Sequence, residues 1–199
     1  MAVGIFIACG CSTGQGDAPA AGAAARPASS PTSAIKVLRL KQVDVALPGP
    51  EDVPDGWVAA GTPRRGGTAQ DDGRIAYGTS GYQAPDLDGA VGFTISSYTS
   101  TADAIDHFAF SKTQYKGGVD PITMTGADQA FAAQGCVMEN ACSATIIAQS
   151  GPVVLSVNIN TKTHDYRAPD PRILNSAARM QIERVRQTQH GKPPTAQAS

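Results

Sequence analysis

The residues of this 199-residue chain best suited to chemistry are its four cysteines. Cys136 and Cys142 are separated by five residues, and a β-branched run follows them. A zinc site needs at least three protein ligands, and none of the histidines, His107, His164 and His190, stands at a zinc-finger spacing. A redox dithiol typically has the spacing C-x-x-C at a helix start. We therefore expect a structural disulfide between Cys136 and Cys142, with no metal site and no cofactor.

Other residue types give weaker indications of a site. The hydrolase motifs G-x-S-x-G and H-E-x-x-H are absent, and no glycine-rich loop links a strand to a helix as nucleotide binding requires. We therefore expect no catalytic residue. Arg64 and Arg65 precede two glycines, and guanidinium and backbone N–H groups together can bind an anion. These two arginines are the ligand-binding candidates, and the alternative for them is a solvated loop.

The first eleven residues, MAVGIFIACGC, contain a short apolar run followed by small residues and two cysteines. The stretch Ala8-Cys9-Gly10-Cys11 resembles the bacterial lipobox, in which the cysteine is acylated and becomes the mature N-terminus. The small residues at −3 and −1 favour Cys11 over Cys9, because Phe6 occupies the −3 position of Cys9. The resemblance implies that residues 1–11 are a lipoprotein signal segment, and we expect its usual basic region to lie upstream of Met1.

Composition divides the rest of the chain. Residues 12–34 lack the large apolar residues that would offset the entropy of an ordered chain, so we expect a disordered linker there. A flexible linker of that length has a mean reach of roughly 25 Å. We expect one folded domain over residues 35–188 and a disordered polar tail over residues 189–199.

Hydrophobic periodicity indicates the elements of that domain. Residues 35–47 alternate like a strand, whereas residues 61–73 are polar and glycine-rich like a surface loop. The other expected strands cover 74–82, 90–98, 122–125 and 130–133, and a hairpin covers 144–149 and 153–159. Helices are expected at 101–115, after a Ser100 cap, and at 171–187, after Asp170 and Pro171. This order favours an α+β fold with a mostly antiparallel sheet and the helices on one face.

The charge balance limits the partners. The formal net charge is −1 and the isoelectric point is near 6.3. Nucleic-acid binding requires a basic surface that neutralises phosphates, so we expect no nucleic-acid partner. The same balance argues against an electrostatic attraction to anionic lipid. Any contact with a membrane is therefore expected through a lipid anchor.

Three segments read together resemble a known class. They are Gly126–Phe131 (GADQAF), the hairpin, and the final segment DPRILNSAARMQIERV. Over residues 126–186 the chain is similar to the extracytoplasmic sensor-like domains of actinobacterial receptor-type serine/threonine kinases, and with its N-terminus it looks like a secreted actinobacterial lipoprotein. The resemblance implies ligand binding at the cell surface and supplies no catalytic residue.

These observations favour one function and leave others open. We expect a lipid-anchored domain on the extracytoplasmic face of the cell membrane, non-catalytic, that binds a ligand or an envelope protein. A secreted or anchored cell-envelope enzyme is the alternative, and a purely structural envelope protein is a third reading. An apolar cleft, a titratable pair or a flat apolar patch, respectively, would distinguish them.

Overall fold

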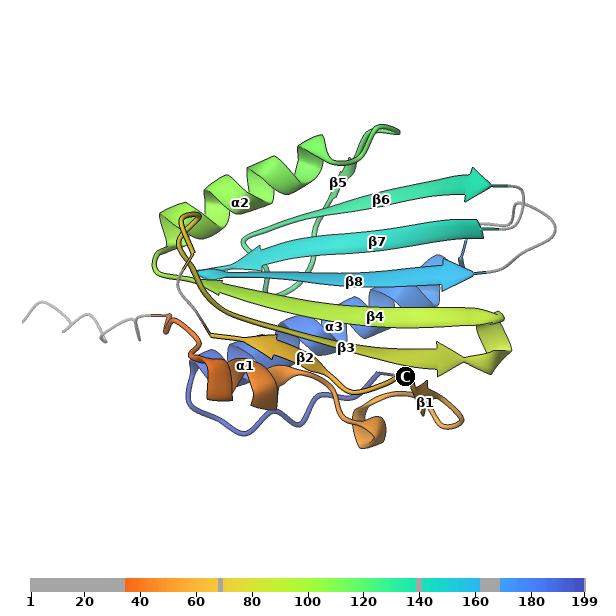
Figure 1. The fold of residues 1–199 in the computed structure, drawn as a ribbon, viewed down its shortest axis with the longest axis horizontal. Helices are drawn as coiled ribbons and strands as arrows, with labels where there is room; N and C mark the ends of the chain where they lie inside the picture. The colour runs from red at the N-terminus through yellow and green to blue at the C-terminus, as the bar shows by residue number, and fades with distance from the viewer. Residues whose placement is uncertain (1–34, 68–69, 139–140, 162–168, 199) are drawn as a thin grey trace, which may run out of the picture. The chain divides into compact units, whose positions relative to one another are not determined.

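The computed structural model describes residues 35–67, 70–138, 141–161 and 169–198. The expected signal segment and linker lie outside these residues. Within them, eight antiparallel strands form one sheet in the order β1-β3-β4-β8-β7-β6-β5, with β2 also paired to β3 (Figure 1). This confirms the expected α+β class. The strands are β1 (Val58–Ala59), β2 (Arg64–Gly66), β3 (Arg74–Ala84), β4 (Gly89–Tyr98), β5 (Asp120–Ile122), β6 (Gln129–Met138), β7 (Ala141–Ser150) and β8 (Val153–Thr161).

Three α-helices pack on the sheet, one more than expected. They are α1 (Leu40–Ala46), α2 (Thr101–Thr113) and α3 (Pro171–Gln189). Ser100 caps α2 and Asp170 caps α3, each side chain accepting from a backbone N–H of the first turn, so both expected helix starts are confirmed. None of the helices in the described part of the chain is both long and apolar enough to cross a membrane.

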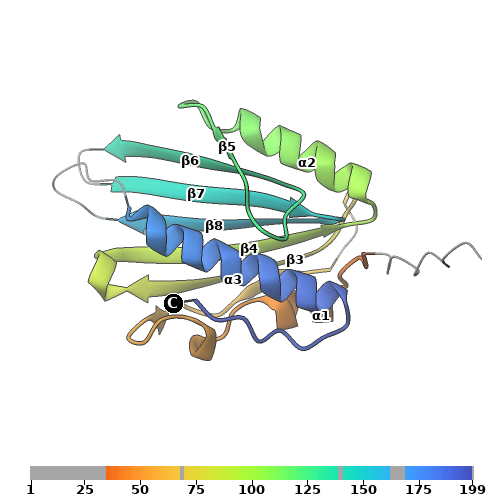
Figure 2. The ribbon, with the colours of Figure 1, turned by 180° about the vertical axis from the view of Figure 1, so that it is seen from behind.

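The helices occupy both faces of the sheet. Adjacent strand residues point to opposite faces, and in β7 Ile146 belongs to the core under α1 and α3, whereas Ile147 belongs to the core under α2. Figures 1 and 2 show α3 behind the sheet in one view and in front of it in the other. The expectation that both helices share one face is therefore wrong for α2, because the strands bury apolar residues on both sides.

Helix α1 replaces the strand expected over residues 35–47. Val43 and Ala46 are buried three residues apart, which is helical spacing, and the Gln42 side chain accepts from the Arg39 backbone N–H at 2.9 Å. The apolar residues of 35–47 fit both the alternation of a strand and the spacing of a helix, so the periodicity alone did not distinguish the two. Gly78 of β3 lets α1 approach, because a Cβ there would lie 2.9 Å from both Leu47 Cδ1 and Val43 Cγ1.

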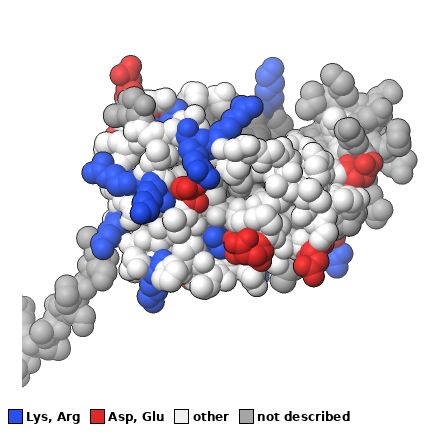
Figure 3. Space-filling model, turned by 60° about the horizontal axis from the view of Figure 1, so that its bottom comes forward, with Lys and Arg blue, Asp and Glu red and all other residues white. Residues whose placement is uncertain are grey.

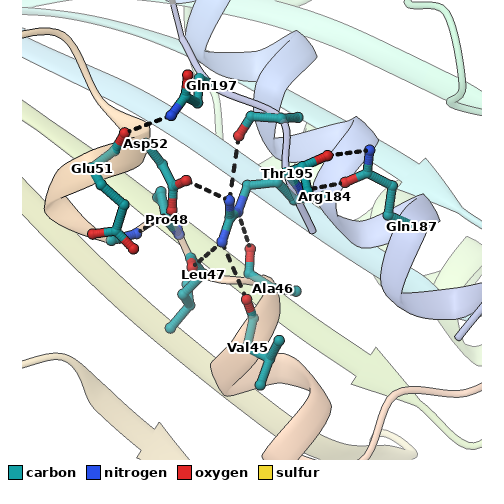
Figure 4. Close-up of polar contacts among 12 residues, drawn as sticks. Val45, Ala46, Leu47, Pro48, Glu51, Asp52, Arg184, Gln187, Thr195 and Gln197 are labelled. Atoms are coloured by element: carbon teal, nitrogen blue, oxygen red, sulfur yellow. Dashed lines mark hydrogen bonds and ion pairs between the residues drawn. The ribbon is translucent and has the colours of Figure 1, made fainter. Parts of the chain in front are cut away.

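The chain segments around β3 and after α3 also differ from expectation. The expected surface loop 61–73 contains β2, whose Arg64 and Gly66 pair with Thr79 and Tyr77 of β3. The expected disordered tail instead follows a defined path after α3, with Ala198 N donating to Asp52 O at 2.9 Å. Figure 4 shows Gln197 of this segment donating to Glu51 O. Its partners are backbone carbonyls and the side chains of Arg184 and Gln187, which composition does not reveal.

Candidate functional site

Within the described residues, one face of the sheet is covered by a helix only at one end. Phe108 of α2 packs there against Phe131, with ring centroids 5.3 Å apart, and against Ile147 and Val154. Figure 1 looks onto this face and shows α2 along its upper left margin. We call the rest the open face. Its side chains are small and mostly polar: Thr79, Gln83, Ala90, Gly92, Thr94, Ser143, Thr145, Ser156, Asn158 and Asn160.

The strand register arranges these side chains in rows across the sheet. Gly92 pairs with Asn158, which in turn pairs with Thr145. A Cβ at position 92 would lie 2.5 Å from Asn158 Oδ1, so the asparagine amide lies over the glycine. Directly opposite residues have Cβ atoms about 4.5–5.5 Å apart, which places hydroxyl and amide groups side by side. The open face therefore presents adjacent hydrogen-bonding groups without charge along β4, β8 and β7.

The open face is hollowed at the end farthest from α2. A hollow of ≈ 400 Å³ lies there, lined by Gln83, Asp88, Ser143 and Asn160 among others. Thr161 also lines it, but as the residue after Asn160 in β8 it points its side chain to the opposite face of the sheet, the face of Val157 and Ile159. This hollow is the strongest candidate for a ligand site.

The disulfide lies beside this hollow. Cys136 of β6 and Cys142 of β7 are register partners and are bonded, so the disulfide expected from the sequence is present. Cys142 lines the first hollow, and Cys136 lines a second one of ≈ 190 Å³ that also contains Tyr115. Ser143 lines both. The disulfide thus stands between two hollows and fixes the strands that form their shared wall.

The two candidate arginines do not form one site. They are neighbours in β2 and therefore point to opposite faces of the sheet. Arg65 is on the α1 side, where its Nε lies 2.7 Å from Asp44 Oδ1. Arg64 pairs with Thr79 at the margin of the open face. The anion site in which both arginines converge is therefore not formed.

A third hollow, of ≈ 490 Å³, lies beside α2 and contains titratable groups. It is lined by Asp71, Asp72, Asp103, Asp106, His107 and Phe110. Hydrogen bonds from the hydroxyls of Thr99 (2.5 Å) and Ser100 (2.8 Å) lower the pKa of Asp103. Burial lowers the pKa of His107, which stacks on Tyr98 with ring centroids 5.1 Å apart. Burial also raises the pKa of Tyr98.

The remaining candidates contribute little. Ser80 is buried in the sheet, and no group of three or more His, Cys, Asp or Glu side chains within the described ranges is placed to hold a metal. Cys9, Cys11 and His164 lie outside the described residues. Sequence reasoning missed the open face. The sequence contains a signal for it, because the residues of β4 and β8 alternate between apolar ones and small or polar ones, which places the latter on one face.

Comparison with known proteins gives remote similarity to solved structures alone. No family model matches the sequence, and no curated protein matches it. Among solved structures, the extracellular domain of PknH from Mycobacterium tuberculosis aligns with a TM-score of 0.45 and 10% sequence identity, covering 79% of this chain and 100% of that one. At this level of similarity, function has to be argued from the residues themselves.

Proposed function

We propose that this chain is a lipid-anchored extracytoplasmic domain that binds an uncharged, hydroxyl-rich ligand on the open face of its sheet. The chemistry of that face fits a neutral glycan. The domain acts by binding, and it catalyses no reaction. Cys11 carries the lipid, with Cys9 as the less favoured acceptor.

The hollow at the disulfide end of the open face carries the ligand proposal. Asn160, Gln83 and Ser143 lie on the same face of neighbouring strands and bring amide and hydroxyl groups to it. Amides and hydroxyls both donate and accept, so they match the hydroxyl groups of a sugar, which also do both. The charged lining residue Asp88 stands at the β3–β4 turn, away from the central rows.

The disulfide supports the extracytoplasmic location. Cys136 is exposed, and exposed disulfides persist in oxidising compartments outside the cytoplasm. The anchor rests on the resemblance of residues 8–11 to the lipobox. Two acyl chains or more give stable membrane attachment, whereas one chain gives only a reversible one.

The alternative, a cell-envelope enzyme, is favoured by a different place. His107 and four aspartates share the hollow beside α2, and burial shifts the pKa of His107. Shifted titratable groups in a hollow are typical of active sites as well as of structural networks. An enzyme would lose activity with His107→Gln and keep it with Asn160→Ala, whereas a binding domain would lose binding with Asn160→Ala alone.

The ligand proposal is tested by NMR on the full chain produced without lipid, with Cys9 and Cys11 changed to Ser. Neutral oligosaccharides of glucose, galactose and mannose are titrated in turn. We expect the side-chain amide resonances of Asn158 and Asn160 to shift with one of them. The amides of Asn175 and Gln197, which line a hollow beside α3, are the internal control and should stay in place.

A matched pair of variants sharpens the test. Asn160→Asp keeps the shape of the side chain and replaces its donor group with a negative charge, so binding should weaken about tenfold or more. Asn175→Asp makes the same change beside α3 and should leave binding unaltered. A loss of binding in Asn175→Asp in place of Asn160→Asp would rule the proposal out. So would unchanged resonances of the open face with all of the sugars.

The anchor is tested separately by metabolic labelling with a palmitate analogue. Wild-type protein should take up the label, and Cys11→Ser should not. Labelling that survives Cys11→Ser and disappears with Cys9→Ser would move the anchor to Cys9. If the wild-type protein took up no label, the proposal of a lipid anchor would be wrong, and the ligand proposal would be unaffected.

A further inference from the structure

The outer surface of α1 combines exposed apolar and basic side chains. Leu40 is 40% exposed and Val45 is 48% exposed, and Ile35 just before the helix is 47% exposed. Lys41 stands between them, one turn before Val45 on the same side of the helix. We call this the α1 surface: Ile35, Lys36, Arg39, Leu40, Lys41 and Val45.

The charge of this surface differs from that of the whole chain. Lys36, Arg39 and Lys41 are exposed and basic. The acidic residue of α1, Asp44, is paired with Arg65 of β2 at 2.7 Å, which removes it as a counter-charge. Figure 3, which views the molecule from below, shows Lys and Arg side chains gathered over the end where the described chain begins. The net charge of −1 therefore conceals a local basic surface.

The surface is rigidly attached to the domain. Beneath α1, Val43 and Leu47 contact the backbone of Gly78. The carbonyl groups of Val45, Ala46 and Leu47 all accept from the Arg184 guanidinium, which holds the C-terminal end of the helix. At the other end, Ile35 lies over Gly151, where a Cβ would approach it to 2.6 Å. The basic and apolar groups are thus presented in a fixed arrangement.

The α1 surface also lies next to the proposed anchor along the chain. The described domain begins at Ile35, so Lys36 and Arg39 are among its first charged residues after the segment that contains Cys11. Basic side chains near an anionic leaflet are attracted to it, and adjacent apolar side chains enter the headgroup boundary. Long Lys and Arg side chains can reach the phosphates while their methylene groups remain beside the apolar residues.

We propose that the α1 surface docks on the anionic lipid surface of the membrane that holds the chain. This proposal rests on the proposed anchor for its location, but the docking itself needs no acyl chain. Because α1 packs on the sheet face opposite the open face, docking leaves the open face directed away from the lipid. The membrane contact thus orients the ligand site outward.

The test uses the full chain with Cys9 and Cys11 changed to Ser, so that binding is measured without a lipid anchor. Co-sedimentation with vesicles that contain phosphatidylglycerol is compared with vesicles of phosphatidylcholine alone, which report any contribution of the apolar residues 2–9. We expect stronger binding to the anionic vesicles, and loss of that excess at about 1 M salt, where the screening length falls to about 3 Å.

Charge reversal locates the contact. The variant Arg39→Glu/Lys41→Glu should lower binding to anionic vesicles at least about tenfold, because each basic residue at the surface contributes about a fivefold factor. The variant Lys112→Glu/Lys116→Glu makes the same change of net charge around the end of α2 and should bind as before. Equal losses from both variants, or equal binding to both vesicle types, would overturn the docking proposal while palmitate labelling still decides the anchor.

Discussion

Arg184 Nη1 lies 2.8 Å from Asp52 Oδ1, and both side chains are less than a tenth exposed. The same guanidinium donates to the carbonyl groups at the end of α1 and to Ala196 O of the C-terminal segment (Figure 4). One side chain of α3 therefore holds α1, the segment around Asp52 and the C-terminal segment together. The pairing is stable because the guanidinium satisfies its donors with several acceptors in a place shielded from water.

Removing Arg184 should destabilise the whole domain. In Arg184→Met, Asp52 remains buried without its partner and several carbonyl groups lose a donor, so unfolding should require about 3 kcal/mol less. Arg184→Lys should not restore stability, because lysine lacks the planar fork. Urea unfolding measures the change. Arg179→Met, at an exposed position of the same helix, is the control, and a loss as large in this control would contradict the role of the ion pair.

The disulfide should stabilise the strands that wall the two hollows. Cys136 and Cys142 are six positions apart, so breaking their disulfide should lower the free energy of unfolding by about 2 kcal/mol by the chain-entropy relation. Cys136→Ala/Cys142→Ala should lower the urea midpoint, and dithiothreitol should lower that of the wild type equally. If dithiothreitol lowered the midpoint of the double variant as well, the effect would not come from this bond.

Acidification should destabilise the protein through His107. Burial lowers the pKa of His107 below its ordinary value of 6.5, an effect to which Arg74 adds and which Asp72 opposes. The unfolded chain then binds more protons than the folded one as the pH falls below about 6.5, so stability is present above that pH and is lost toward the folded pKa. In His107→Gln, the melting temperature should fall less between about pH 7 and pH 5.

His190→Gln serves as the control for this pH dependence. The ring of His190 is exposed at the end of α3, where its Nδ1 lies 2.7 Å from Arg186 O. This variant should keep the wild-type slope of melting temperature against pH. A slope that follows the loss of His190 and not of His107 would show that the hollow beside α2 does not carry the effect.

The sequence predicted the long elements better than the short ones. The hairpin of β7 and β8 and the start of α3 follow from strong local signals, namely the Ser150-Gly151-Pro152 turn and Asp170-Pro171. Helix α1 has no such local signal. Its seven residues are fixed by packing on Gly78 and by Arg184, which are far away in the chain. The path of the C-terminal segment likewise depends on particular partners, namely the side chains of Arg184 and Gln187 and the backbone around Asp52.

The candidate site was only partly predictable, for a related reason. The Cys136–Cys142 bond joins residues close in sequence, so spacing and the missing partners were sufficient to expect it. The open face depends on strand order. Asn158 and Gly92 become neighbours because β4 pairs with β8, with α2 and three strands between them in the chain. Arg64 and Arg65 were grouped because a loop was expected, and a strand separates them onto two faces.

The fit of α1 on β3 gives the last prediction. In Gly78→Ala the new Cβ would lie 2.9 Å from two side chains beneath α1, so the helix must shift and stability should fall by about 1–3 kcal/mol. Gly135→Ala is the matched control, since its Cβ meets no atom within 4 Å in strand β6. Thermal unfolding compares the two. Because α1 carries the docking surface, Gly78→Ala should also weaken binding to anionic vesicles, and unchanged binding together with unchanged stability would mean that Gly78 does not seat the helix.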